Sequence, residues 1–177
     1  MMILGFLAEQ ALHGYELRRR MEQLFGHARP ISYGTVYPAI NRLERAGLLR
    51  KESGPRKAGA APVTLHLTDA GRAELLGRLR SVSGQDVTDG HHFMVVLAFL
   101  SLLPDQAERD AVLQRRLDFL SQPASFFYDG DRPLRVDDIT DPYRCGILIS
   151  ARATSRAERA WLREQLQVTA GTDGGNE

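Results

Sequence analysis

The stretch SYGTVYPAINRLERAGLL, residues 32–49, decides the fold that we predict for this chain. Val36, Ile40 and Leu43 recur at i, i+4 and i+7, so at helical pitch they share one narrow apolar stripe. The helix should end at Gly47, because glycine readily takes the left-handed conformation that closes a helix. We therefore predict a helix that holds one face in a core and leaves the other face open.

The open side of this helix lacks carboxylates and large aliphatic side chains. Asn and Arg make paired hydrogen bonds to base edges, and hydroxyls bond phosphates, so this face suits nucleic acid. Asn41 and Arg42 are the best candidates for reading bases, whereas Tyr37 could bond a phosphate or pack across the helix flank. In this stretch we expect DNA contacts from Ser32, Tyr33, Gly34, Thr35, Tyr37, Pro38, Asn41 and Arg42. Taken alone, the pattern is equally compatible with a surface helix whose polar face is arbitrary.

Pro38 bears on where this helix begins, because proline has no N–H to give to the carbonyl four residues earlier. With Ser32 as the cap, the Gly34 carbonyl would lose its partner. With Thr35 as the cap, Pro38 falls in the first turn, where N–H groups have no helical partner anyway. We predict a loose turn from Ser32 and regular helix from about Thr35.

Charge is distributed unevenly along the 177 residues, although the net charge is only +1. Residues 1–80 hold 13 Lys and Arg against 7 Asp and Glu, and residues 81–177 hold 10 against 15. A basic half joined to an acidic half suggests two modules with different partners, and the basic half is the candidate for nucleic acid.

Composition narrows the class of protein. A hydrophobic content of 43% and a charged content of 25% are typical of a globular protein, and the apolar run at residues 93–100 is too short to span a bilayer. The N-terminus lacks the pattern of a signal peptide, and the lone Cys145 excludes an intrachain disulfide. We therefore expect a cytoplasmic protein without membrane contact.

The elements around the central helix follow the order of a winged helix. Short helices are predicted at residues 2–10 and from Gly14 to Gly26, and a β-hairpin at residues 48–53 and 63–67. Thr68 should cap the helix after the hairpin. The hairpin tip, GPRKAGAAP, carries Arg56 and Lys57, which we expect to reach the DNA backbone as a wing.

The second half predicts helices. Residues 81–90 are polar, 93–103 are dense in apolar residues, a helix should begin at Pro104, and a last helix should cover 143 to about 168. The predicted fold class is mainly α: a winged helix-turn-helix domain of three helices and a β-hairpin wing, then an α-helical dimerisation domain. We place these at residues 1–82 and 83–170, with a disordered tail at 171–177.

The first half of the chain contains several short motifs: His13-Gly14-Tyr15-Glu16-Leu17, Gly34-Thr35-Val36-Tyr37-Pro38-Ala39-Ile40 with Arg42-Leu43-Glu44, Gly47-Leu48-Leu49, and Leu67-Thr68-Asp69-Ala70-Gly71. In combination these motifs resemble the PadR family of bacterial transcriptional regulators. The family's longer branch adds a helical C-terminal domain, which residues from Phe93 and around Glu158 and Trp161-Leu162 resemble more weakly.

This resemblance implies a homodimeric winged-helix repressor that binds a palindromic operator in double-stranded DNA. It also implies that C-terminal helices pair the protomers and that a small, often aromatic molecule relieves repression. The wing departs from the family, which usually has more basic residues there and an aromatic residue near the end of its second strand. This departure puts the wing's contribution to DNA affinity in question.

Other assignments stay open at the level of sequence. Phe93, Phe126, Phe127 and Trp161 could line an aromatic effector pocket, although such residues are more often core or dimer interface. Adjacent histidines such as His91-His92 rarely chelate one ion, and Cys145 among aliphatic residues is more often a small core residue than a redox sensor. We predict no metal, cofactor or enzyme activity, because no catalytic grouping is visible. The alternative function is a winged helix that binds protein instead of DNA.

Overall fold

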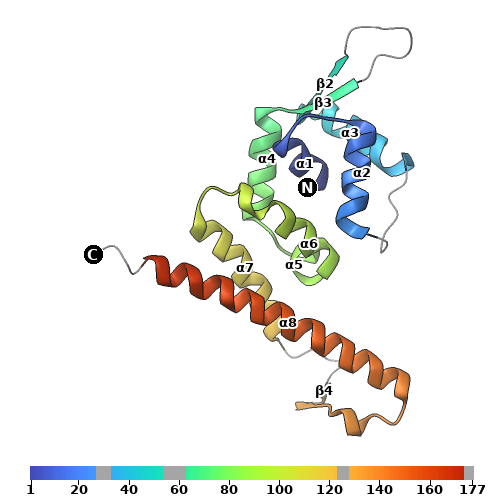
Figure 1. The fold of residues 1–177 in the computed structure, drawn as a ribbon, viewed down its shortest axis with the longest axis vertical. Helices are drawn as coiled ribbons and strands as arrows, with labels where there is room; N and C mark the ends of the chain where they lie inside the picture. The colour runs from blue at the N-terminus through green and yellow to red at the C-terminus, as the bar shows by residue number, and fades with distance from the viewer. Residues whose placement is uncertain (27–32, 54–62, 123–127, 174–177) are drawn as a thin grey trace. The chain divides into compact units, whose positions relative to one another are not determined.

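A computed structural model describes residues 1–26, 33–53, 63–122 and 128–173 of the chain (Figure 1). The chain divides into two compact units, Met1–Pro104 (unit 1) and Asp105–Glu177 (unit 2). The elements of unit 1 are α1 (Met2–Glu9), β1 (Leu12–His13), α2 (Gly14–Phe25), α3 (Tyr33–Arg45), β2 (Leu49–Ser53), β3 (Val63–Leu67), α4 (Asp69–Arg80), α5 (Gln85–Thr88), α6 (Gly90–Phe99) and the 3-10 turn η2 (Leu100–Leu102).

Unit 1 contains the predicted winged helix, and the mainly α fold class is confirmed. Strands β2 and β3 form the antiparallel wing hairpin, in which Leu49 pairs with Leu67 and Lys51 with Leu65. A third strand, β1, pairs with β3 and makes the sheet order β1-β3-β2. The sequence did not predict β1, because two residues are too few to show the alternation of a strand.

The core of the winged helix lies between α1, α2, α3 and the sheet. The predicted stripe of α3 is confirmed, since Val36 and Ile40 are each 1% exposed and Leu43 is half-buried. Their buried neighbours come from each of the surrounding elements and include Ile3, Leu7, Leu12, Leu17, Met21, Leu49 and Leu65. The core therefore fixes which side of α3 remains open.

Two local motifs connect the helices to the wing. Gly47 has φ of 71°, and the N–H groups of Leu48 and Gly47 donate to the carbonyls of Leu43 and Glu44, which is the Schellman closure of a helix. Thr68 caps α4 by accepting from the Gly71 N–H at 3.0 Å. Both predicted boundaries are confirmed, and both use local chemistry alone.

Helix α6 packs within unit 1. Phe93, Val96 and Phe99 are at most 1% exposed, and the ring of Phe99 lies edge-on to Phe6 of α1 at 5.0 Å between centroids. A Cβ at Gly5 would stand 2.5 Å from the Phe99 ring, so glycine makes this approach possible. The chain consequently divides at Pro104 rather than at the predicted boundary after residue 82.

This packing corrects one sequence-based argument. Residues 93–103 fall in the dimerisation domain that the sequence predicts at 83–170. The apolar stripe of α6 is already covered inside one chain, so it supplies no evidence for dimerisation.

Unit 2 is a helical hairpin with a short connecting ribbon. Its elements are α7 (Gln106–Ser121), β4 (Tyr128–Asp129), β5 (Arg132–Pro133), the 3-10 turn η4 (Val136–Asp138) and α8 (Pro142–Asp173). The predicted start at Pro104 is wrong, because the side chain of Asp105 accepts from the Ala107 N–H and so caps α7. Helix α8 runs through Asp173, into the predicted tail at 171–177, and residues 174–177 lie outside the described part.

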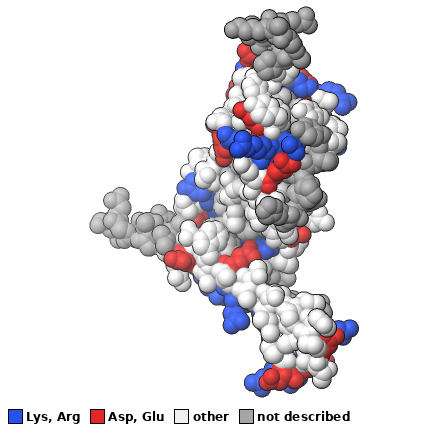
Figure 2. All heavy atoms as spheres, turned by 45° about the vertical axis from the view of Figure 1, so that its right-hand side comes forward, with Lys and Arg blue, Asp and Glu red and all other residues white. Residues whose placement is uncertain are grey.

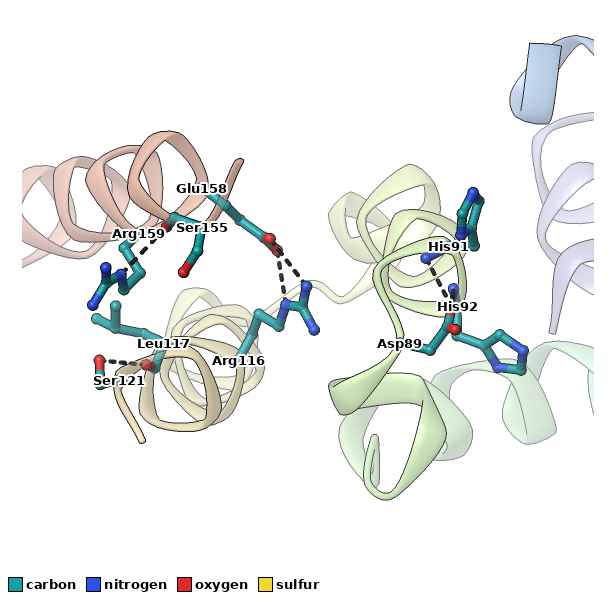
Figure 3. A network of polar contacts seen from close by, with 9 residues as sticks. All are labelled: Asp89, His91, His92, Arg116, Leu117, Ser121, Ser155, Glu158 and Arg159. Atoms are coloured by element: carbon teal, nitrogen blue, oxygen red, sulfur yellow. Dashed lines mark hydrogen bonds and ion pairs between the residues drawn. The ribbon is translucent and has the colours of Figure 1, made fainter. Parts of the chain in front are cut away.

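Helices α7 and α8 are joined by a buried ion pair (Figure 3). The Arg116 side chain is 4% exposed and donates to Glu158 twice, with Nε–Oε1 at 2.7 Å and an Nη–Oε2 bond at 3.0 Å. Val112, Leu113, Leu148 and Leu162 bury the apolar contact around it. Among the described helices of both units, none is long and apolar enough to cross a membrane.

Candidate nucleic-acid interface

The open face of α3 is the candidate interface. Its described side chains include two cations and no exposed carboxylate, and the solvent-exposed residues are Gly34, Thr35, Tyr37, Pro38, Asn41, Arg42 and Arg45. Ser32 lies outside the described residues, and of Tyr33 only the helical backbone is described. The helix begins at Tyr33, earlier than the expected start near Thr35, so Pro38 lies inside it. Because proline has no N–H, Pro38 cannot donate to the backbone carbonyl of Gly34, and Gly34 is exposed to solvent.

Asn41 is held in place on this face. The Lys51 ammonium of β2 lies 2.7 Å from Asn41 Oδ1 and 2.6 Å from Glu44 Oε2. Glu44, the carboxylate nearest this face, is therefore occupied by Lys51. Sequence reasoning missed Lys51, although its position two residues after Leu49 places both on the same side of β2.

Positive charge at the interface comes from α3 itself. Within the described residues, neither Arg42 nor Arg45 pairs with a carboxylate. The Arg45 Nε donates to the backbone carbonyl of Asn41 at 3.3 Å. Most other cations of unit 1 that are described have acidic partners, as in Arg18–Glu22, Arg20–Glu9, Arg50–Glu52 and Arg78–Glu74. The face drawn in Figure 2 likewise shows Lys and Arg groups with Asp and Glu beside them. The arginines of α3 therefore contribute more local potential than the net charge suggests.

Tyr37 and Tyr15 border a cavity of about 420 Å³ beside α3. A Cβ at Gly14 would lie 3.2 Å from the Tyr37 ring, so glycine at the first position of α2 lets this ring pack closely. The Tyr15 ring stacks on the His13 ring with 6.0 Å between centroids, and Tyr15 is 59% exposed. Both rings are thus supported from behind, and both remain accessible at the edge of the open face.

The base of the wing carries a second polar cluster, on the side of β2 opposite Lys51. Glu52 accepts from Arg50 at 2.8 Å and lies 3.2 Å from His66 Nε2. The hydrogen bond from Arg50 and the positive charge of its guanidinium hold the pKa of Glu52 below its usual value. Arg56 and Lys57, which were expected to reach DNA from the wing tip, lie outside the described residues.

The proposed effector residues are not assembled into one described site. Phe93 is 1% exposed in the core of unit 1, and Trp161 on α8 of unit 2 is 40% exposed. Phe126 and Phe127 lie outside the described residues. An open groove of about 730 Å³ does lie between α7 and α8, lined by residues that include Tyr143, Ile147 and Leu120.

The histidine pair is accounted for by helix capping. The Asp89 carboxylate accepts from the backbone N–H groups of His91 and His92 at 2.9 Å, and so caps α6 (Figure 3). The His92 Nδ1 lies 3.2 Å from Asp86. No group of three or more metal-ligating side chains occurs among the residues that the structure describes.

Comparisons with known proteins give a family match in unit 1. Residues 3–76 match the model of the Transcriptional regulator PadR-like family. No curated protein matches the chain significantly. Among solved structures, the chain is similar to Bacillus subtilis PadR in complex with operator DNA, with 20% identity over 94% of this chain and 95% of that chain, at a TM-score of 0.43.

Two further solved structures are similar to the chain. A PadR-like transcriptional regulator from Bacillus cereus is 20% identical over 92% of each chain, with a TM-score of 0.41. A transcriptional regulator from Clostridium thermocellum is 22% identical over 45% of this chain and 77% of that chain, with a TM-score of 0.42. The family resemblance that the motifs carry is confirmed over residues 3–76, which match the model of the PadR-like family of transcriptional regulators.

Proposed function

We propose that this protein is a sequence-specific DNA-binding regulator that places α3 in the major groove. The observation that carries the proposal is the open face of α3, where Asn41, Arg42 and Arg45 are exposed and Glu44 is engaged by Lys51. At about 1.5 Å per residue, the 13 residues of α3 span about 20 Å, a length that fits the groove. Asn41 and Arg42 would read bases.

The residues around α3 would hold the DNA backbone. Tyr15 and Tyr37 present exposed rings whose hydroxyls can donate to phosphates beside the groove. Ser32, Tyr33, Gly34, Thr35 and Pro38 would contribute contacts near the start of α3. Arg56 and Lys57 of the wing would add sequence-independent attraction to phosphates.

The proposal includes a homodimer that binds a palindromic operator. On α8, Tyr143, Ile147, Ser150, Thr154 and Trp161 recur at intervals of three, four and seven residues, so they share one stripe. Tyr143 is 85% exposed and Ile147 54% exposed, so this part of the stripe is open to solvent. Pairing of two copies along this stripe would remove an apolar surface from water and set two α3 helices on one DNA.

The proposal also makes the protein a repressor that a small molecule releases from DNA. The groove between α7 and α8 borders the α8 stripe, so a ligand bound there would change the pairing of protomers. We keep Phe126, Phe127 and Trp161 as effector candidates. Phe93 would contribute only if the core of unit 1 opened locally, because its ring is buried.

The test is binding to the promoter region upstream of the protein's own gene, followed by fluorescence anisotropy and footprinting. Asn41→Ala and Arg42→Ala should each weaken the specific site by about 1–3 kcal/mol and relax sequence choice. Arg72→Ala is the matched control, since Arg72 is an exposed arginine on α4. Retention of the wild-type footprint by both variants would refute the assignment of α3. Absence of salt-dependent affinity for any DNA would instead favour the protein-binding alternative.

A further inference from the structure

The Lys51 ammonium of β2 contacts the Asn41 side chain of α3. The Lys51 ammonium lies 2.7 Å from Asn41 Oδ1 and 2.6 Å from Glu44 Oε2, so it bridges two side chains of α3. Asn41 and Glu44 are three residues apart and lie one helical turn from each other. The bridge therefore holds the Asn41 amide from one side.

The backbone places Lys51 at this position. Side chains alternate across a strand, so Lys51 lies on the same side of β2 as Leu49, which is 2% exposed in the core. Leu65, which pairs with Lys51 across the hairpin, is 3% exposed, so this side of the hairpin faces the core and α3. Because Gly47 closes α3 directly before β2, the strand returns alongside the helix and brings the ammonium to Asn41.

The ammonium determines how the Asn41 amide is oriented. Lysine can only donate, so the atom that faces it must be the carbonyl oxygen Oδ1. The Nδ2 group is then on the other branch of the amide, away from the ammonium, with two N–H donors. The positive charge beside Oδ1 also opposes the approach of a second donor from a base.

We propose that Lys51 is a positioning residue that makes Asn41 a donor-only reader and so selects guanine over adenine. This inference rests on the proposed function, in which α3 reads bases in the major groove. An asparagine that is free to rotate recognises adenine by accepting from N6 and donating to N7. An asparagine restricted to donating prefers guanine, whose O6 and N7 are both acceptors.

The experiment is selection of binding sites from a random double-stranded DNA pool by five full-length proteins. Wild type defines the operator, and Asn41→Ala identifies the base pair that Asn41 reads. Lys51→Met keeps most of the aliphatic stem and removes the ammonium. Arg50→Met is the matched control, because it removes a cation from the adjacent residue of β2, whose side chain bonds Glu52 instead. Glu44→Gln keeps Lys51 but removes the charge that anchors it.

We expect guanine at the base pair that Asn41 reads in the wild-type selection. Lys51→Met should lower the preference for guanine over adenine about tenfold, which is within the range for one paired base contact. Glu44→Gln should shift the preference in the same direction by less, and Arg50→Met should weaken binding at all sites without changing the preferred base.

Two failures are distinguishable. If wild type enriches an operator and Lys51→Met selects the same base at the Asn41 position, the proposal for Lys51 is overturned while DNA reading by α3 stands. Equal shifts in Lys51→Met and Arg50→Met would also overturn it, because loss of charge alone would then explain the change. If wild type enriches no sequence at all, the proposed function fails and the assignment of Lys51 fails with it.

Discussion

Replacing Glu158 with alanine should destabilise unit 2 more than replacing its partner Arg116 with methionine. Glu158→Ala leaves the Arg116 guanidinium, whose side chain is 4% exposed, without its carboxylate. Breaking a fully buried pair in this way costs about 3–5 kcal/mol. Because the Glu158 side chain is 23% exposed, water can enter the vacated space, and we expect a loss of about 2–3 kcal/mol in the free energy of unfolding.

Arg116→Met has a smaller expected effect. Methionine fills much of the volume of the arginine stem, and the remaining Glu158 carboxylate can regain water, so we expect a loss of about 1–2 kcal/mol. In the double variant, Arg116→Met should partly restore the stability lost in Glu158→Ala, since no buried charge then lacks a partner.

Urea unfolding followed by Trp161 fluorescence measures this asymmetry. Trp161 is the only tryptophan of the chain and lies one turn after Glu158 on α8, so its signal reports unit 2. Protein concentration must be equal in all samples, because dimerisation would add to apparent stability. Glu164→Ala, at an exposed position of the same helix, is the control. The reasoning is refuted if Glu158→Ala costs no more than Glu164→Ala, or less than Arg116→Met.

The remaining predictions use matched pairs of positions. Gly71→Ala should cost about 1–3 kcal/mol in thermal or urea unfolding, because its Cβ would lie 1.9 Å from the Leu48 carbonyl oxygen. In Gly77→Ala, in the same helix, the new Cβ meets nothing within 4 Å, so the free energy of unfolding should rise by about 0.5–1 kcal/mol. Equal effects at both glycines would contradict the packing of α4 on the turn that contains Leu48. In light scattering, Ile147→Glu should convert the proposed dimer to monomer, whereas Ile149→Glu, at 50% exposure on another side of α8, should not. Dimers in both variants would rule out the α8 stripe as the interface.

The parts of the fold that the sequence predicted depend on contacts between near neighbours. The α3 stripe of Val36 and Ile40 follows from helical period, and Thr68 as a cap follows from its hydroxyl. Strand β3 follows from the alternation of apolar and polar residues over 63–67. In each case the information lies within a few residues, so no knowledge of the rest of the chain is needed.

The parts that the sequence did not predict depend on which distant segments meet. The apolar residues of α6 indicated burial, but not that Phe99 would pack on Phe6 and Gly5, more than ninety residues earlier in the chain. A pattern of hydrophobicity predicts that a face is covered, but it does not identify the element that covers it. That ambiguity allowed an interface between protomers to be inferred where one protomer supplies the cover.

The candidate site shows the same limit, because its exposed residues were predictable and its supporting residue was not. Asn41 and Arg42 stand out on the sequence of α3, but Lys51 looks like one more surface lysine of a wing strand. Its role depends on three separate features. They are the left-handed backbone conformation of Gly47, the alternation that places Leu49 and Lys51 on one side of β2, and the three-residue separation of Asn41 and Glu44. Each is visible locally, and only their combination in space brings an ammonium to the amide. Base preference in such a helix therefore depends on the strand behind it as well as on the residues that face DNA.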